Sequence, residues 1–192
     1  MSNLLNHLKI IRTHRKFVRE ACFKMGLYWQ GLTHDLSKYS LTELKICKYY
    51  TGKRSPHQVA REKLGYSPSW THHYHTNKHH YSWWWDESET GEIVPIKMPY
   101  RYLVESLADM LGASKAYNPE NWKPQMLLDY WEQKCVGKRI MHEDSVILLN
   151  YLIHQIVRNG EDDFFEWYEE LKVFIKIKYE NNELELFKSI LP

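Results

Sequence analysis

Apolar residues recur at helical spacing along most of this chain, and no stretch of useful length alternates apolar and polar residues as a half-buried strand would. Leu4, Leu8 and Ile11 begin this pattern in a first helix predicted over residues 3–25, before the helix-stopping Gly26. Further helices are predicted over residues 29–38, 40–50, 55–65, 69–82, 100–116, 122–135, 142–158, 162–179 and 183–190. The pattern therefore predicts an all-α fold.

Local signals refine this outline. Ser40 and Glu43 have the spacing of a capping box, which predicts a helix start at that point. Residues 83–97 are polar, turn-prone and interrupted by proline, so they are expected to form a lid or an exposed loop. A chain of 192 residues is long enough to bury its own core, and we expect a single helical domain over residues 1–192.

The composition argues against several classes of protein. The net charge is only +2 with neutral histidines and no clear basic patch is present, so nucleic-acid binding through bulk charge is not expected. No apolar stretch approaches membrane-spanning length, and residues 1–11 mix polar with apolar side chains, unlike a signal peptide. The three cysteines are far apart, which argues against disulfides and thiolate zinc sites. We therefore expect a cytoplasmic protein without a membrane partner.

The adjacent pair His34-Asp35 is the first candidate for chemistry. One imidazole nitrogen and one carboxylate oxygen from neighbouring residues form a mixed donor set that suits transition metals. A helical His14 precedes the pair, and Asp109 follows on a helix whose neighbours are apolar. A buried carboxylate is costly unless it is paired or binds a metal. The alternative for Asp109 is pairing with an arginine or capping of another element.

The order of these motifs resembles the HD superfamily of metal-dependent phosphohydrolases. The segment His-Asp-Leu-Ser-Lys at 34–38 is similar to the His-Asp-Ile-Gly-Lys of the HD-GYP branch, and the Asp109 segment resembles the "ADxL" helix of HD proteins. The resemblance covers residues 1–116 and implies an HD-like core, with residues 117–192 as a helical extension. The chain also resembles small uncharacterised bacterial and phage proteins with a His-Asp-x-Ser-Lys motif, a likeness that assigns no activity.

The HD resemblance implies roles for particular residues. His14, His34, Asp35 and Asp109 would be ligands of a divalent transition metal (Mn, Fe, Zn, Ni or Co), and Asp35 would also orient the attacking water. Lys38 would lie near the phosphate of a small substrate such as a nucleotide, and the alternative is an ordinary surface lysine. No residue is assigned to an organic cofactor.

Five histidines fall between His72 and His80. His79-His80 matches a His-His pair that HD proteins with several metals place between the His-Asp and the final Asp. His75 lies four residues before His79, so on one helix the two rings would project together toward the cavity of His34. A second metal or a phosphate site is therefore predicted from His75, His79 and His80, with surface imidazoles as the alternative. His72 and His73 are not expected to be ligands.

Departures from the HD pattern limit the activity. No Gly-Tyr-Pro follows His79-His80, so cyclic-dinucleotide hydrolysis is not supported, and Ser37 replaces a glycine. Residues 83–85 are three tryptophans, which suit a base-stacking pocket or ordinary packing. The aromatic run over residues 164–174 suits the core or the seam of a homodimer. The favoured function is phosphohydrolysis; the alternatives are an inactive HD-like metal- or phosphate-binding module, a phage accessory protein, and metal sequestration by the histidines.

Overall fold

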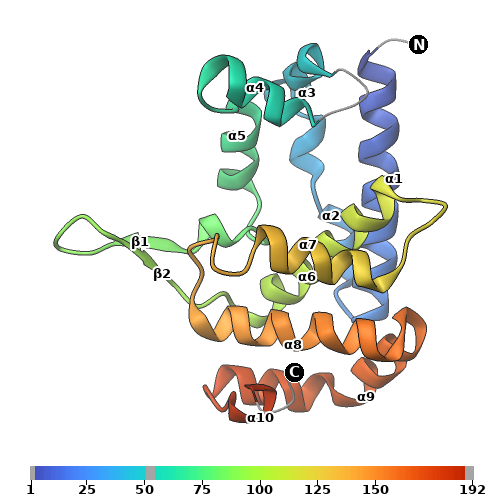
Figure 1. Cartoon of the computed structure of the whole chain (residues 1–192), viewed down its shortest axis with the longest axis vertical. Coiled ribbons are helices and arrows are strands. Elements are labelled where there is room, and N and C mark those ends of the chain that lie inside the picture. The colour runs from blue at the N-terminus through green and yellow to red at the C-terminus, as the bar shows by residue number, and fades with distance from the viewer. Residues whose placement is uncertain (1–2, 51–54, 189–192) are drawn as a thin grey trace.

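The computed structural model describes residues 3–50 and 55–188, and helices dominate it (Figure 1). The α-helices are α1 (Asn3–Lys24), α2 (Tyr28–Thr33), α3 (Leu41–Leu44), α4 (Pro56–Leu64), α5 (Pro68–Thr76), α6 (Tyr100–Tyr117), α7 (Pro124–Lys134), α8 (Glu143–Asn159), α9 (Glu161–Glu180) and α10 (Glu185–Lys188). Short 3-10 helices are η1 (Leu36–Tyr39), η2 (Lys45–Tyr49) and η3 (Tyr81–Trp83). The prediction of a helical protein is confirmed.

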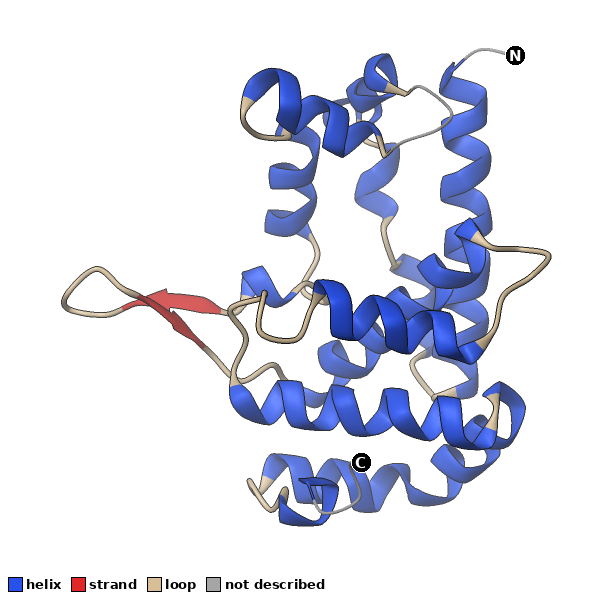
Figure 2. Cartoon of the chain, viewed as in Figure 1, coloured by secondary structure: helices blue, strands red, loops and turns tan. Residues whose placement is uncertain are grey.

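A small hairpin is the exception to this helical class. Strands β1 (Trp85–Glu87) and β2 (Ile93–Pro95) pair antiparallel, with Asp86 opposite Val94, and the hairpin projects from the helical body (Figure 2). The polar stretch between the strands forms the expected turn. Sequence analysis had no signal for the strands because each contains only three residues, which is too short for an alternating pattern.

The core forms where α6 meets its neighbours. Helix α6 packs along α1 and contacts α7, α8 and α9, while α9 lies on α8 (Figure 1). Leu103, Leu107 and Leu111 recur at helical spacing on α6, and each is at most 1% exposed. Burying a leucine side chain contributes about 1.5–3 kcal/mol, so this stripe anchors α6 in the protein.

Helices α1 and α6 approach each other closely at Gly112. A Cβ atom added to Gly112 would lie 2.5 Å from Val18 Cγ2 and 2.9 Å from the Val18 backbone nitrogen. His14 lies one turn before Val18, and Asp109 lies one turn before Gly112, so this close approach brings the two polar side chains together. The apolar packing of α1 on α6 thereby positions the candidate site.

Two predicted helices are corrected. Residues 29–38 do not form one helix, because α2 ends at Thr33 and Asp35 adopts a left-handed backbone, with φ 56°, before η1 begins. Residues 69–82 do not form one helix either, because α5 ends at Thr76. There the Asn77 side chain donates to the backbone oxygen of His73 at 2.8 Å, which competes with continuation of the helix.

Several other boundaries match the sequence predictions. Helices α1, α4, α6, α7, α8 and α9 agree with predicted helices to within two residues at each end. The predicted last helix, residues 183–190, is observed as α10, and its final two residues lie outside the described part of the chain. Within the aromatic run, Phe164, Phe165 and Tyr168 are buried in the core, whereas Phe174 is exposed. None of the described helices is both long and apolar enough to cross a lipid bilayer.

Candidate metal centre

His34 and Asp35 occupy the turn between α2 and η1. Their side chains are 0% exposed, and the left-handed backbone of Asp35 is a conformation that residues with a Cβ atom seldom adopt. Arg15 of α1 fixes this turn, because its Nε donates to the His34 backbone oxygen at 2.8 Å and its Nη2 donates to the Leu32 oxygen at 3.1 Å. The unusual backbone is thus held by α1 and aims the Asp35 carboxylate into the protein.

A first group of donor atoms gathers around one oxygen of Asp35. Its Oδ2 lies 3.2 Å from His14 Nε2 and 3.3 Å from His34 Nε2. Oδ1 of Asp109 lies 3.1 Å from the same His14 nitrogen and 3.3 Å from the same His34 nitrogen. One donor atom from each of the four residues lies within 4.8 Å of the others, which is compact enough to surround one metal ion.

A second group gathers around the other oxygen of Asp35. Its Oδ1 lies 3.3 Å from His73 Nε2 and 3.6 Å from His79 Nε2, and His80 completes a set within 4.8 Å. Asp35 Oδ1, His79 Nε2 and His80 Nε2 are buried without a hydrogen-bond partner in the described structure. Buried polar atoms nearly always have a hydrogen-bond partner. Three neighbouring nitrogen and oxygen atoms without one are therefore suitable ligands for a metal ion. The chemistry of both groups therefore suits a transition metal.

Two glutamates orient the imidazole rings. Oε1 of Glu105 lies 3.0 Å from His34 Nδ1 and 3.2 Å from His79 Nδ1, so both rings present their other nitrogen, Nε2, to Asp35. Glu43 Oε2 lies 2.9 Å from His73 Nδ1 and directs that ring in the same way. A carboxylate behind a histidine fixes the ring orientation and makes the ring a more basic metal ligand.

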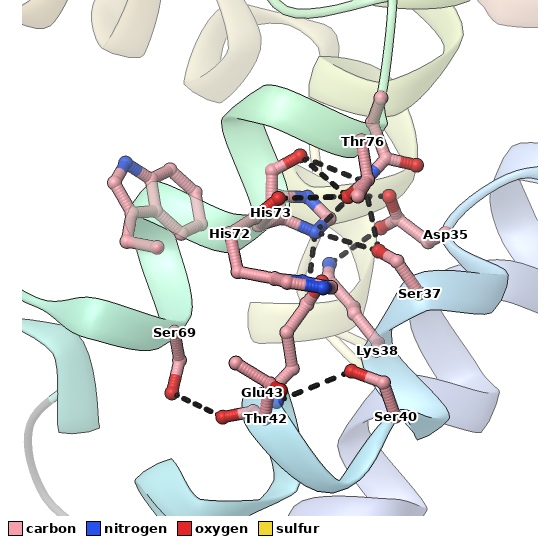
Figure 3. A network of polar contacts seen from close by, with 12 residues as sticks. Asp35, Ser37, Lys38, Ser40, Thr42, Glu43, Ser69, His72, His73 and Thr76 are labelled. Atoms are coloured by element: carbon pink, nitrogen blue, oxygen red, sulfur yellow. Dashed lines mark hydrogen bonds and ion pairs between the residues drawn. The ribbon is translucent and has the colours of Figure 1, made fainter.

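Glu43 belongs to a wider polar network, drawn in Figure 3. Its Oε1 lies 2.9 Å from His72 Nδ1, while Ser37 Oγ accepts from Asn77 Nδ2 at 2.8 Å and lies 3.3 Å from His73 Nδ1. The predicted capping box is therefore only half present. Ser40 Oγ accepts from the Glu43 backbone nitrogen, but the carboxylate turns away to the histidines (Figure 3).

Charges in the cluster shift several pKa values. Burial acts to raise the pKa of Asp35, but His34 and Lys38 outweigh it and hold that pKa well below its usual value. Burial acts to lower the pKa of Lys38, whose Nζ lies 2.5 Å from Asp35 Oδ2, and the nearby carboxylates raise it overall. Burial and the neighbouring His79 lower the pKa of His80, which keeps this ring neutral. A neutral imidazole is the form that binds metals.

A cleft of about 500 Å³ opens onto both groups. Its lining includes His14 and Asp109 from the first group and His73 and His80 from the second. Lys38 also lines it, between the groups. The remaining donors, His34, Asp35 and His79, are not part of the cleft lining. This volume is typical of pockets for small molecules.

The structure places the predicted residues as follows. It brings His14, His34, Asp35 and Asp109 together, places Lys38 beside Asp35, and adds His79 and His80. The placement of His75 is corrected: it is exposed and outside the donor groups, because α5 ends before His79 and the two rings share no helical face. His73, which was not expected to be a ligand, is buried beside Asp35.

Two further residues of the cluster, Glu105 and Glu43, were missed or misassigned from the sequence. Glu105 lies four residues before Asp109 on the same face of α6, a spacing that could have identified it. Glu43 was assigned to capping alone. The tryptophans at 83–85 do not line the cleft; Trp70, Tyr74, Tyr81 and Tyr130 do, while Trp84 and Trp85 donate to the backbone oxygens of Lys78 and Ile140.

The sequence of the chain was compared with known families and proteins. A family model described as "Family of unknown function (DUF5662)" matches residues 3–155. The chain belongs to this family. The matched segment contains every residue of both donor groups and both orienting glutamates. No curated protein and no solved structure matches the chain.

Proposed function

We propose that this DUF5662 protein is a metal-dependent phosphohydrolase that acts on a small phosphate ester such as a nucleotide. One observation carries the proposal: the two oxygens of Asp35 face separate sets of imidazole nitrogens beside a cleft. The resemblance of the motif order to HD phosphohydrolases supports it. We also propose that residues 1–116 form an HD-type core and that α7 to α10 form its extension.

The donor set favours a transition metal over magnesium or calcium. Imidazole nitrogens together with carboxylate oxygens suit Mn, Fe, Zn, Ni or Co, whereas magnesium and calcium prefer oxygen donors alone. A divalent transition metal supplies Lewis acidity, which activates water and withdraws charge from phosphate oxygens. Asp35 is placed to serve both donor groups, so its loss would affect the whole centre.

The residues of the chain have distinct proposed roles. His14 and Asp109 face the cleft from α1 and α6, and they complete the first group from the side that substrate reaches. Asp35 would also orient the attacking water, since its carboxylate is ionised and fixed by the turn. Lys38 stands at the cleft wall with its ammonium held by Asp35, where it can offset charge on a phosphate.

The test combines metal content with turnover. Purified protein is loaded with each candidate metal, its stoichiometry is measured, and a panel of nucleotides and an aryl phosphate is assayed. Asp35→Ala should lose bound metal and turnover while retaining its helical circular dichroism, and the matched control His75→Ala should retain both. Undiminished turnover in Asp35→Ala would refute the proposal. Metal binding without turnover on any substrate would instead support a binding module.

A further inference from the structure

Besides Lys38 and the exposed Arg61, the cleft is lined by a third cationic side chain, Arg139, in the connection between α7 and α8. Its Cζ lies 5.0 Å from the centre of the Tyr81 ring and 5.9 Å from that of Tyr130. Nη2 donates to Tyr130 Oη at 2.8 Å. No carboxylate forms an ion pair with Arg139 in residues 3–50 and 55–188, although the side chain is half-buried and lines the cleft. Its remaining N–H donors are available to a ligand.

A row of aromatic rings joins Arg139 to the donor cluster. The rings of His80 and Tyr74 lie 4.9 Å apart, and those of Tyr74 and Tyr81 lie 6.3 Å apart. The Arg139 guanidinium lies over the ring of Tyr81. The guanidinium is therefore separated from the metal-binding histidines by two tyrosine rings, along one wall of the same cleft.

The backbone around Arg139 is anchored rather than loose. The Arg139 nitrogen donates to the Cys135 oxygen at 3.1 Å, and Trp85 Nε1 at the base of the hairpin donates to the Ile140 oxygen at 2.7 Å. With the flanking rings of Tyr81 and Tyr130, these contacts hold the guanidinium in position before any ligand arrives. Such preorganisation reduces the entropy lost on binding.

We propose that Arg139 binds a second anionic group, a phosphate or a carboxylate, of the substrate whose ester phosphate lies at the metal centre. The planar guanidinium matches either anion through paired N–H donors. Lys38 does not fill this role, because it lies beside Asp35 at the metal centre, where it is assigned to the ester phosphate. The assignment rests on the proposed phosphohydrolase function and narrows it: the substrate is a small phosphate ester with a second negative charge, and Arg139 determines specificity for it.

The test measures binding with probes that cannot be hydrolysed. Alkylphosphonates, alkane bisphosphonates and phosphonocarboxylates of increasing chain length are titrated by calorimetry into the full-length, metal-loaded protein. At the best length, the doubly anionic probes should bind about 10-fold to 100-fold more tightly than the alkylphosphonate, the range for hydrogen bonds to charged groups. The second anion, phosphonate or carboxylate, that gives the larger gain in affinity indicates whether the natural substrate carries a phosphate or a carboxylate there.

Variants separate Arg139 from general charge effects. Arg139→Gln should abolish the preference for the second anion and leave alkylphosphonate affinity unchanged, while Arg139→Lys should retain part of it. The exposed neighbour Lys138, which is outside the cleft lining, provides the control Lys138→Gln, with the preference intact. If the wild type shows no preference for doubly anionic probes, or if Arg139→Gln retains it, the assignment of Arg139 is wrong. The proposed metal centre is not affected by either result. If no phosphonate binds the metal-loaded wild type, the proposed function fails and this assignment fails with it.

Discussion

Glu105 offers a sharp perturbation of the proposed metal centre, because it contacts one histidine of each donor group. Its Oε1 lies 3.0 Å from Nδ1 of His34 and 3.2 Å from Nδ1 of His79. Burial acts to raise the pKa of Glu105, but both histidines outweigh it and lower that pKa, so the group is a carboxylate at neutral pH. Glu105→Gln keeps the size and removes the charge that makes the two rings basic.

We expect Glu105→Gln to weaken metal binding at both groups. Loss of a carboxylate behind a metal-binding histidine costs about 10-fold to 100-fold in affinity, or about 1.4–2.7 kcal/mol for each group. Glu43→Gln is the matched control, because among the residues of the two donor groups Glu43 contacts only His73. It should weaken the second group and leave the first unchanged.

The assay is a two-step titration of metal-free protein with Mn²⁺ or Zn²⁺ in competition with a chelator. The wild type should bind two ions, Glu105→Gln should lose affinity in both steps, and Glu43→Gln should lose it in one. Wild-type affinity in Glu105→Gln, or equal weakening of both steps in Glu43→Gln, would refute the assignment of these glutamates.

Three further outcomes follow from the packing and the charges. Gly112→Ala should lower the free energy of unfolding by about 1–3 kcal/mol in urea titrations, because its new Cβ atom meets Val18; unchanged stability would contradict the close crossing. Burial lowers the pKa of His57 to about 3, so between about pH 6.5 and pH 3 only the unfolded chain gains a proton there. Relative to His57→Gln, the wild type should lose up to about 1.4 kcal/mol per pH unit between pH 6 and pH 4 in denaturant titrations, and parallel pH profiles would contradict this. His73→Ala should reduce metal stoichiometry measured by elemental analysis whereas His75→Ala should not, and the reverse result would contradict the observed orientation of α5.

The sequence predicted the long helices because each buries a continuous apolar stripe. The periodic leucines of α6, for example, are among the residues that the structure buries most completely. The pattern was less informative where a short segment turns at a polar side chain. Asn77 and the left-handed Asp35 end helices through local backbone geometry, which leaves no periodic trace in the sequence.

The same limit explains which site residues were found. His14, His34, Asp35 and Asp109 were recognisable from their order in the chain, whereas His73 was not expected to be a ligand. Once α5 ends at Thr76, the turn that follows returns His79 and His80 toward His73, and ring centres of His73 and His80 lie 4.7 Å apart. That return depends on tertiary contacts of the Asn77 side chain with Ser37, which no local pattern predicts.

The energetics of this cluster argue that it is retained for a function rather than for stability. Four carboxylates meet there with a single lysine among the described residues: Asp35, Glu43, Glu105 and Asp109 around Lys38. Buried ion pairs contribute little net stability compared with apolar residues of similar volume, and a left-handed aspartate adds strain of about 1–3 kcal/mol. A core of leucines would hold α1 against α6 at lower cost. Without a metal, burial acts to lower the pKa of His34, but the surrounding carboxylates outweigh it and raise that pKa, so the His34 proton offsets part of the negative charge. A bound cation would take that place, and the histidine nitrogens that face Asp35 are placed to share its coordination.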